Sequence, residues 1–419
     1  MATSCPFVNK KDLTPCELLD KNEIPMKIRA IRATPVNIPL ERPYYWSTGI
    51  YPGTSKTIIE VETDEGLTGL GESPSWDCAD TIARHLGPRL VGRDSLDFAG
   101  CEERCVPETR VVQNTDDASI LKSYGGIEMA LWDLRGKACK QPLYKLLGGA
   151  VRTKISFTEY FAFRPASGRA PEETTPKAVA AYCARMREEH GATCFEGKLT
   201  LGDPELEIAA VREIRGAVGP DAMLRLDANM AWSLSSARRI LRAIEPYNVR
   251  NYEDPVATFD EMAKLRQHSP IPFSTHTPDL RAAVRLGVPD TFVLNLAVLG
   301  GISRTLKFIA ACEAMGVGFW CYSGDSGVAS AAYLHVVAAT HWIHEPSQSL
   351  FRWQCEDVIE EGPFKPRNNI LEVPQGPGLG VTLSPAGLRR CHERFRSEGP
   401  YDHYHDPQAP GKMRRLPLH

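Results

Sequence analysis

The sequence predicts an α/β protein in which a barrel of parallel strands follows a smaller α+β domain. In residues 26–150 the predicted strands come before the predicted helices, which is typical of an α+β unit. From residue 151 onwards, short apolar runs alternate with amphipathic helical segments, the pattern of repeated strand–helix units. Seven or eight such units within about 210 residues fit a closed barrel better than an open sheet. A doubly wound sheet is the alternative, but no G-x-G-x-x-G motif follows an early strand.

The composition excludes several classes of protein. The 419 residues are 42% hydrophobic, enough for a large core, and the net charge of −3 implies no general affinity for nucleic acid. No apolar run reaches the roughly 18 residues of a transmembrane helix, so we expect no membrane interaction. The N-terminus lacks the apolar segment of a secretory signal, and the 12 cysteines include no C-x-x-C pair. We therefore expect a cytoplasmic protein with reduced thiols.

The chain divides into five segments at the points where its composition and the spacing of its apolar residues change. They are a polar arm at 1–25, the α+β domain at 26–150, the barrel at 151–362, a Pro- and Gly-rich segment at 363–400, and a tail at 401–419. We expect the fourth segment to cross back and pack on the α+β domain. The tail contains three His and two Asp but few core-forming residues, so we expect a loose polar tail rather than a metal site.

The α+β domain is expected to supply a small sheet and a loop. Residues 26–40 predict one strand, and residues 55–73 predict a hairpin with an Asp-Glu-Gly turn. Residues 42–55, between them, are rich in aromatic side chains, Gly and Ser. We expect this segment to be a loop long enough to reach over a neighbouring active site. Residues 75–147 are predicted to be mostly helical.

The barrel strands are predicted from apolar runs that end in polar residues. The helix at 203–219 is the best marked of the intervening segments, with Asp203 as its N-cap, Pro204 at its first position and Gly219 at its end. The predicted strands are 155–160, 193–200, 223–229, 249–254, 271–276, 291–297, 317–323 and, more weakly, 349–354.

Two of these runs end in a carboxylate, at Asp227 and Glu253, and the next ends in His276. Parallel barrel strands deliver their last residues to one mouth, so these three side chains are candidates to bind one divalent cation. Carboxylates suit Mg²⁺, while an imidazole also leaves Mn²⁺, Fe²⁺ or Zn²⁺ open. The alternatives are that each acid caps a helix or pairs with an Arg, and that His276 is neutral and bonded to a backbone group.

Other polar residues are expected at the same mouth. Lys198 and Thr200 are two residues apart on one strand and so point the same way. Beside a dication, Lys198 should lose basicity and could act as a proton acceptor or as a clamp on a carboxylate. The alternative is a surface lysine that pairs with Glu196. The remaining candidates at strand ends are Tyr160, Asn229, Asn295, Cys321, Tyr322 and Asp325.

These motifs resemble the enolase superfamily, in its mandelate racemase and glucarate dehydratase branch. The resemblance rests on IEMALWDLRGK, QPLYKLLGG, GLTGLGE, LDANMAW and YEDP, and it spans residues 27–395. It implies an α+β capping domain, completed by the C-terminal segment, on a modified (β/α)₇β TIM barrel. It also implies a divalent ion, usually Mg²⁺, held by Asp227, Glu253 and a residue of the fifth strand. That residue is Glu or Asn in familiar members and is His276 here.

The resemblance also implies a reaction that begins with loss of the proton α to a carboxylate, through an enediolate. The usual base is the second Lys of a Lys-x-Lys motif, aided by an Asp–His dyad. This sequence keeps Lys198, but it has Thr200 at the second Lys and Asn295 at the Asp, and Cys321 or Tyr322 falls near the His. A racemase needs competent groups on both faces of the substrate, whereas a dehydratase can use one base.

We therefore expect a metal-dependent hydro-lyase that dehydrates a sugar acid or related hydroxy carboxylate, a small-molecule substrate. Lys198 is the candidate base or clamp and Tyr322 the candidate acid. Substrate is expected to contact Tyr160, Thr200, Asn229 and Asn295. The alternatives are a racemase or isomerase with a non-standard base, and a non-catalytic binding homologue. The resemblance also implies a homo-oligomer.

Overall fold

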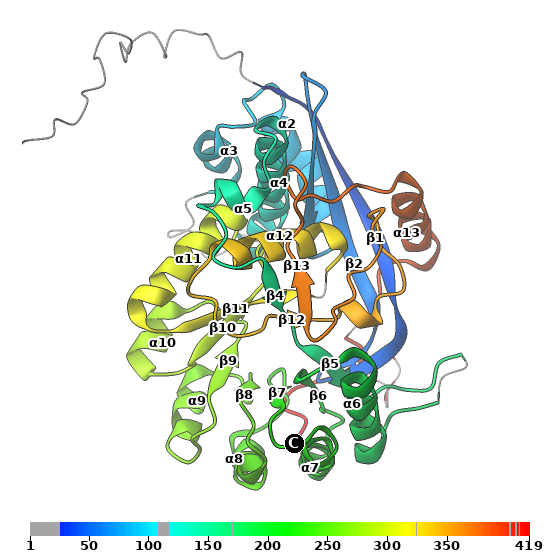
Figure 1. Cartoon of the computed structure of the whole chain (residues 1–419), viewed down its shortest axis with the longest axis vertical. Coiled ribbons are helices and arrows are strands. Elements are labelled where there is room, and N and C mark those ends of the chain that lie inside the picture. Colours follow the sequence, from blue (N-terminus) through cyan, green and yellow to red (C-terminus); the bar gives the residue numbers. More distant parts are fainter. Residues whose placement is uncertain are drawn as a thin grey trace, which may run out of the picture.

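The structure is a computed structural model that describes residues 26–107, 117–168, 171–323, 325–401, 404–406, 409 and 411–419. The arm predicted at residues 1–25 lies outside the described residues. The molecule has an antiparallel cap packed on a parallel barrel (Figure 1), which confirms the predicted fold class. None of the helices in the described part of the chain is long and apolar enough to cross a lipid bilayer.

The cap is built on a three-stranded antiparallel sheet. Its strands are β1 (Ile28–Trp46), β2 (Gly49–Thr63) and β3 (Thr68–Ser73), in the order β1-β2-β3. Helix α4 (Asp117–Ala138) lies directly on this sheet, and Gly71 makes that approach possible. A Cβ at Gly71 would lie 2.0 Å from the carbonyl oxygen of Gly126 in α4, a distance that no side chain tolerates.

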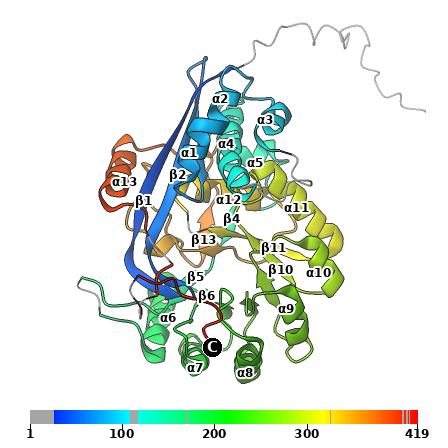
Figure 2. The same cartoon turned by 180° about the vertical axis from the view of Figure 1, so that it is seen from behind.

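The aromatic segment at 42–55 was predicted as a loop, and this prediction is wrong. It extends the β1–β2 hairpin, in which Tyr44 pairs with Tyr51 and Trp46 pairs with Gly49. Tyr and Trp favour extended backbone, and their backbone groups find partners across the hairpin. The expected position is nevertheless correct, because the tip of the hairpin reaches down to the barrel (Figure 2).

The barrel contains eight parallel strands. Backbone hydrogen bonds close the ring, from the amide of Thr158 to Ser347 at 2.9 Å and from the amide of Ser347 to Ser156 at 3.0 Å. This closure excludes the doubly wound alternative. The strands, in order around the ring, are β5 (Glu159–Ala162), β6 (Cys194–Lys198), β7 (Met223–Asp227), β8 (Asn251–Glu253), β9 (Phe273–Thr275), β10 (Thr291–Leu294), β11 (Gly318–Ser323) and β12 (Gln348–Ser349).

The first and last predicted barrel strands differ from the structure. The first begins later than predicted, so Tyr160 lies inside β5 opposite Glu196 rather than at a strand end. The last is only two residues long, because the chain turns into the 3₁₀ helix η4 (Phe351–Trp353) where the sequence suggested a strand. Short apolar runs do not distinguish a strand from a helical turn, which explains the second error.

The helices surround the barrel and fill the space beneath the cap. Helix α7 (Pro204–Val218) has the predicted Asp203 N-cap and ends at Gly219. The others are α1 (Cys78–Thr81), η1 (Ile82–Leu86), α2 (Gly87–Leu90), α3 (Phe98–Cys105), α5 (Leu143–Leu146), α6 (Pro176–His190), α8 (Leu234–Ile244), η3 (Glu245–Tyr247), α9 (Phe259–Arg266), α10 (Leu280–Leu286), α11 (Ile302–Met315), α12 (Gly327–Ala339) and α13 (Pro385–Glu398). Helix α12 is buried along nearly its whole length between cap and barrel (Figure 1).

The C-terminal segment returns to the cap, as α13 lies along β1 (Figure 1). The ring of His392 in α13 hydrogen-bonds the carbonyl oxygen of Pro35 at 2.7 Å. The sequence suggested only strands and turns here. One strand forms, β13 (Ile370–Glu372) against β4 (Lys154–Ser156), but the chain then enters α13 with Ser384 as N-cap. The expected loose tail instead has ordered anchors, including a hydrogen bond of 2.7 Å from the amide of Leu418 to Ala231.

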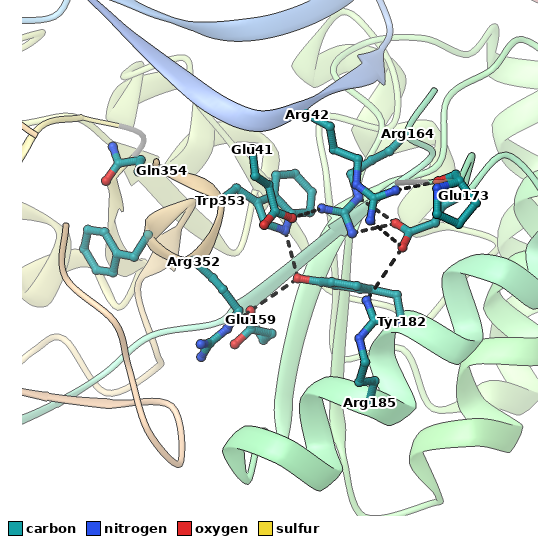
Figure 3. Close-up of polar contacts among 12 residues, drawn as sticks. Glu41, Arg42, Glu159, Arg164, Glu173, Tyr182, Arg185, Arg352, Trp353 and Gln354 are labelled. Atoms are coloured by element: carbon teal, nitrogen blue, oxygen red, sulfur yellow. Dashed lines mark hydrogen bonds and ion pairs between the residues drawn. The ribbon is translucent and has the colours of Figure 1, made fainter. Parts of the chain in front are cut away.

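A buried ionic and aromatic network joins the β1 strand of the cap to the barrel (Figure 3). Arg164, which follows β5, lies between the rings of Tyr182 and Trp353, 4.4 and 4.7 Å from their centroids. Its guanidinium pairs with Glu173 and with Glu41 of β1, each at 2.6 Å. Because Arg164 is fully buried, these partners replace its hydration and hold the hairpin in position.

We predict that Arg164→Ala lowers the free energy of unfolding by about 3–5 kcal/mol, because it leaves Glu173 buried without its main partner. Urea unfolding measures this loss. Arg212→Ala is the matched control, since its pair with Glu213 is exposed and should contribute less than about 1 kcal/mol. Equal losses in the two variants would contradict a structural role for the network.

Candidate active site at the barrel mouth

The three predicted ligands meet at the carboxyl ends of neighbouring strands. One ligand atom each from Asp227, Glu253 and His276 lies within 4.8 Å of the other two. The strand register explains this, because Asp227 pairs with Glu253, and Glu253 pairs with Ser274, two residues before His276. Both carboxylates are buried, and the imidazole is partly exposed to the mouth.

Glu253 is the most constrained of the three groups. Both of its carboxylate oxygens are buried, and neither accepts a well-angled hydrogen bond from the described residues, although Nε2 of His276 lies 2.6 Å from Oε1. Burial, and then the charge of Asp227, raise the pKa of Glu253 to about 8. With the imidazole of His276 as its one close side-chain partner among the described residues, the buried carboxylate is poorly satisfied, so this position is suited to a cation.

The imidazole of His276 is oriented by its other nitrogen. Nδ1 lies 2.8 Å from the carbonyl oxygen of Val293, which can only accept, so Nδ1 carries a proton and Nε2 faces Glu253. Burial lowers the pKa of His276, but the carboxylates of Glu253, Asp254 and Asp227 outweigh burial and raise it to about 10. In the protein without an ion, a proton on His276 therefore balances part of the carboxylate charge.

The backbone beyond the ligands adopts the left-handed conformation at three non-glycine residues. They are Asn229 (φ 42°), Met230 (φ 61°) and Asp254 (φ 38°). The amide of Asn229 donates to Asp227 Oδ1 at 2.8 Å, and the amide of Met230 donates to the carbonyl oxygen of Asp254 at 2.8 Å. These bonds hold the backbone in a conformation that costs about 1–3 kcal/mol per residue. Strained residues of this kind are concentrated at functional sites.

Lys198 lies beside the three ligands. Its ammonium contacts both Asp227 Oδ2 and Asn229 Oδ1, and the side chain is buried. The alternative that Lys198 pairs with Glu196 is wrong, because Glu196 lies deeper in the barrel and pairs with Arg225 at 3.4 Å. The predicted base or clamp thus touches a predicted metal ligand.

A cavity of about 510 Å³ opens over this cluster. It has the size of a small-molecule site. Of the predicted residues, Lys198, Asn229, His276, Asn295 and Tyr322 line it. The cap contributes Lys56 and Tyr44, and no acidic side chain is among the described lining residues. A larger hollow of about 1260 Å³ lies nearby at residues 201–206 and 412–418, but it contains none of the three ligands.

Two predicted substrate contacts do not line the cavity. Tyr160 lies one layer below the mouth, where its ring packs on Tyr44 at 6.1 Å and on Trp353 at 5.3 Å. Thr200 is buried beyond the end of β6, and its hydroxyl has no hydrogen-bond partner among the described residues. Tyr322 does line the cavity, edge-on to His276 at 5.5 Å, and burial raises the pKa of its hydroxyl.

Sequence reasoning missed Lys56, which the cap strand β2 inserts into the mouth. Its ammonium lies 2.5 Å from Asp325 Oδ1, and both side chains are buried. Asp325 Oδ2 accepts from Asn295 and from Tyr333, each at 2.7 Å. Burial lowers the pKa of Lys56, but the charge of Asp325 outweighs it and the net shift is upward. No sequence pattern links a cap strand to a barrel loop 269 residues later.

The residues present fit a divalent ion. Asp227, Glu253 and His276 offer oxygen and nitrogen ligands from three sides, and the unsatisfied oxygens of Glu253 are the observation that favours a cation. A neighbouring cavity leaves room for oxygen atoms of a ligand. The fold and the site together define a capped barrel whose mouth carries a ligand set suited to a divalent ion.

The family is shown by comparison with known proteins. Residues 28–148 match the mandelate racemase / muconate lactonizing enzyme N-terminal domain, and residues 178–387 match the enolase C-terminal domain-like family. The chain belongs to the enolase superfamily, in its mandelate racemase and muconate lactonizing branch, and is an enzyme of that superfamily.

Three relatives illustrate the range of the branch. The chain is 31% identical to a probable glucarate dehydratase of Streptomyces coelicolor, over 88% of this chain and 92% of that protein. It is 29% identical to a chloromuconate cycloisomerase of Pseudomonas putida, over 87% and 98%. An enolase of Pseudomonas fluorescens Pf0-1, solved with magnesium, potassium and tartrate, is 26% identical with a TM-score of 0.82, over 90% and 94%.

We predict that Mg²⁺ binding releases a proton from His276. Since the pKa of His276 without an ion is about 10, the imidazole is protonated at neutral pH and must become neutral to bind. Glu253, with its pKa raised to about 8, must also be ionised to bind. The apparent affinity should therefore rise with pH by about tenfold per unit between pH 8 and 10, and more steeply below pH 8. Titration calorimetry in two buffers of different ionisation enthalpy counts the released proton.

The matched control is His276→Asn, whose amide oxygen can bind the ion but does not titrate. This variant should bind Mg²⁺ with less dependence on pH and with fewer protons released. Identical heats for the native chain in the two buffers would contradict the assignment of His276 as a ligand.

Proposed function

We propose that this enzyme is a divalent-metal-dependent hydro-lyase that dehydrates a sugar acid or related hydroxy carboxylate. The observation that carries the proposal is the convergence of Asp227, Glu253 and His276 beneath a cavity whose described lining has lysines but no acid. Such a cavity attracts an anion. Mg²⁺ is the proposed ion, with Mn²⁺ as an alternative, and it is supported by the magnesium in the P. fluorescens relative.

Asp227, Glu253 and His276 would hold the ion, which would supply positive charge to bind the substrate carboxylate and to acidify its α-proton. The chain supplies the proton transfers. Lys198 is next to the ligand Asp227 and faces the cavity, so it is the group placed to take the α-proton. Lys198 is an ammonium in its ion pair with Asp227, so it must first release a proton to solvent before its amine can accept the α-proton. A cation held by Asp227 would weaken this ion pair and favour that release.

The leaving hydroxyl needs a proton donor, and the cavity offers two. Tyr322 has a raised pKa, so its hydroxyl is protonated at neutral pH and can donate. Lys56 is protonated beside Asp325 and is a second donor from the cap side. Transfer of the α-proton to Lys198 and loss of the β-hydroxyl as water leave an enol, which becomes a 2-oxo acid by taking up a proton.

The arrangement favours a lyase over a racemase. A racemase needs a group that can accept a proton on each face of the substrate. The second lysine, Lys56, pairs with Asp325, which is not a candidate metal ligand, so a bound cation would not release it from its ion pair as it would release Lys198 from Asp227. A cycloisomerase needs only one such group, and the likeness to a chloromuconate cycloisomerase favours it as the second candidate. The two reactions differ in whether water is lost.

We predict that the Mg²⁺-loaded enzyme exchanges the α-proton of its substrate with D₂O and releases water, when tested on a panel of sugar acids. Nuclear magnetic resonance measures the exchange, and detection of the 2-oxo acid measures dehydration. Lys198→Ala should slow exchange by about 10²–10⁴-fold, the usual contribution of a general base. Exchange without loss of water would instead support an isomerase.

Lys307→Ala is the matched control, because Lys307 is exposed on barrel helix α11 and is remote from the lining residues. It should leave exchange unchanged. Undiminished exchange in Lys198→Ala would contradict the role of Lys198, and metal-dependent binding with no exchange of any acid would indicate a binding homologue.

A further inference from the structure

The C-terminal tail crosses the barrel mouth, although the family match ends at residue 387. Figure 2 shows the tail, in red, running from the side of β1 past β5 and β6 to the chain end between α7 and α8. Two of its residues, Tyr401 and Tyr404, line the cavity above the metal ligands. The tail is therefore part of the wall of the site.

The near end of the tail sits on a buried polar cluster of the cap. The amide of Tyr401 donates to Ser55 Oγ at 2.9 Å, and Ser55 Oγ in turn donates to Asn37 Oδ1 at 2.7 Å. Asn37 Nδ2 donates to the carbonyl oxygen of Gly399 at 2.8 Å. Gly53 leaves room for Tyr401, because a Cβ at this position would lie 2.7 Å from the ring of Tyr401.

The far end of the tail is tied to two barrel loops. Arg414 donates to the carbonyl oxygens of Trp46 and Leu201, at 3.3 and 3.2 Å, and so joins the hairpin tip to the loop after β6. The amide of Ser233 donates to the carbonyl oxygen of His419 at 2.9 Å, next to the N-terminus of α8. Anchors on the cap, the hairpin and the loop after β7 hold the tail across the mouth.

Aromatic rings dominate the part of the cavity that the cap and tail provide. Trp46 packs on Tyr404 with ring centroids 5.8 Å apart, and on Tyr51 at 5.9 Å. Tyr44 stacks on Tyr51 at 5.1 Å, and Tyr401 also lines the space. The rings of this wall offer faces and hydroxyl groups and carry no charge. The cations that line the cavity are other residues, Lys56 and Lys122 in the cap and Lys198 and His276 in the barrel.

We infer that Trp46, Tyr401 and Tyr404 form a subsite for the end of the substrate remote from its carboxylate, and that the tail supplies the specificity. This inference rests on the proposed function, since it places the carboxylate at the metal ligands. The ligand class is a hydroxy acid whose far end carries a flat, uncharged face that can stack on rings. A short acid that ends at the metal site does not reach the subsite.

The test compares lactate with phenyllactate, which carries the same carboxylate and hydroxyl and adds one ring. Calorimetry measures the binding of each acid to the Mg²⁺-loaded full-length protein. Phenyllactate should bind about tenfold more tightly than lactate, the free energy of one or two ring contacts. Tyr404→Ala should weaken the binding of phenyllactate by about threefold to tenfold and leave the affinity for lactate unchanged.

Tyr404→Phe keeps the ring and should retain the affinity for phenyllactate. Met413→Ala is the control within the tail, because Met413 is 75% exposed and does not line the cavity, and it should affect neither acid. Equal affinities of the native protein for the two acids, or equal losses for both in Tyr404→Ala, would overturn the subsite. Failure of Mg²⁺ to strengthen the binding of either acid would instead contradict the proposed function.

Discussion

The barrel mouth brings together two buried carboxylates, whose charge must be balanced by protons or by a cation. Asp227 and Glu253 have ligand atoms within 4.8 Å, and both are buried. Like charges at this distance in a dry environment repel strongly, so a proton or a cation must be held with them. Without an ion, the proton on His276 and the ammonium of Lys198 meet this demand. The same two groups would lose this role if a cation occupied the site, which would couple its binding to the proton transfers that we propose.

The site is shared between domains rather than held by the barrel alone. The barrel contributes the ligands and Lys198, while the cap inserts Lys56 and the aromatic hairpin tip. The hairpin is held by Arg164, which has its charge satisfied by Glu41 and Glu173 and its faces covered by rings (Figure 3). Because Trp353 of this network packs on Tyr44 at 5.5 Å, the junction between cap and barrel supports the cavity wall directly.

The chain has the acidic candidate ligands that the resemblance implies, Asp227 and Glu253, but not the implied second Lys or Asp–His dyad. The cluster of Lys56, Asp325, Asn295 and Tyr333 occupies the part of the mouth where an Asp–His dyad was expected from the resemblance. In this cluster the ammonium of Lys56 is paired with the buried carboxylate of Asp325. The ammonium can donate a proton or attract an anion, but it does not readily accept a proton. The chemistry that suits such a mouth is one-sided, with acceptance at Lys198.

The sequence by itself determined the barrel, the cap and the convergence of the three candidate ligands. Apolar runs ending in Asp227, Glu253 and His276 specify strand ends, and parallel strands bring their ends together, so the convergence follows from local pattern and register. The two ends of helix α7, at Asp203 and Gly219, could also be predicted from the sequence, because capping depends on neighbouring residues in the chain.

Only the tertiary structure decided which further groups share the mouth. Lys56 meets Asp325 across 269 residues. The tail donates backbone amides, a group that every residue except Pro supplies, to the hydroxyl of Ser55 and to the carbonyl oxygen of Ala231. Tyr160 was misplaced for a related reason, since a shift of two residues in β5 moved it one layer below the cavity. Pairings between distant segments depend on how whole domains pack, and no local periodicity in the sequence encodes them.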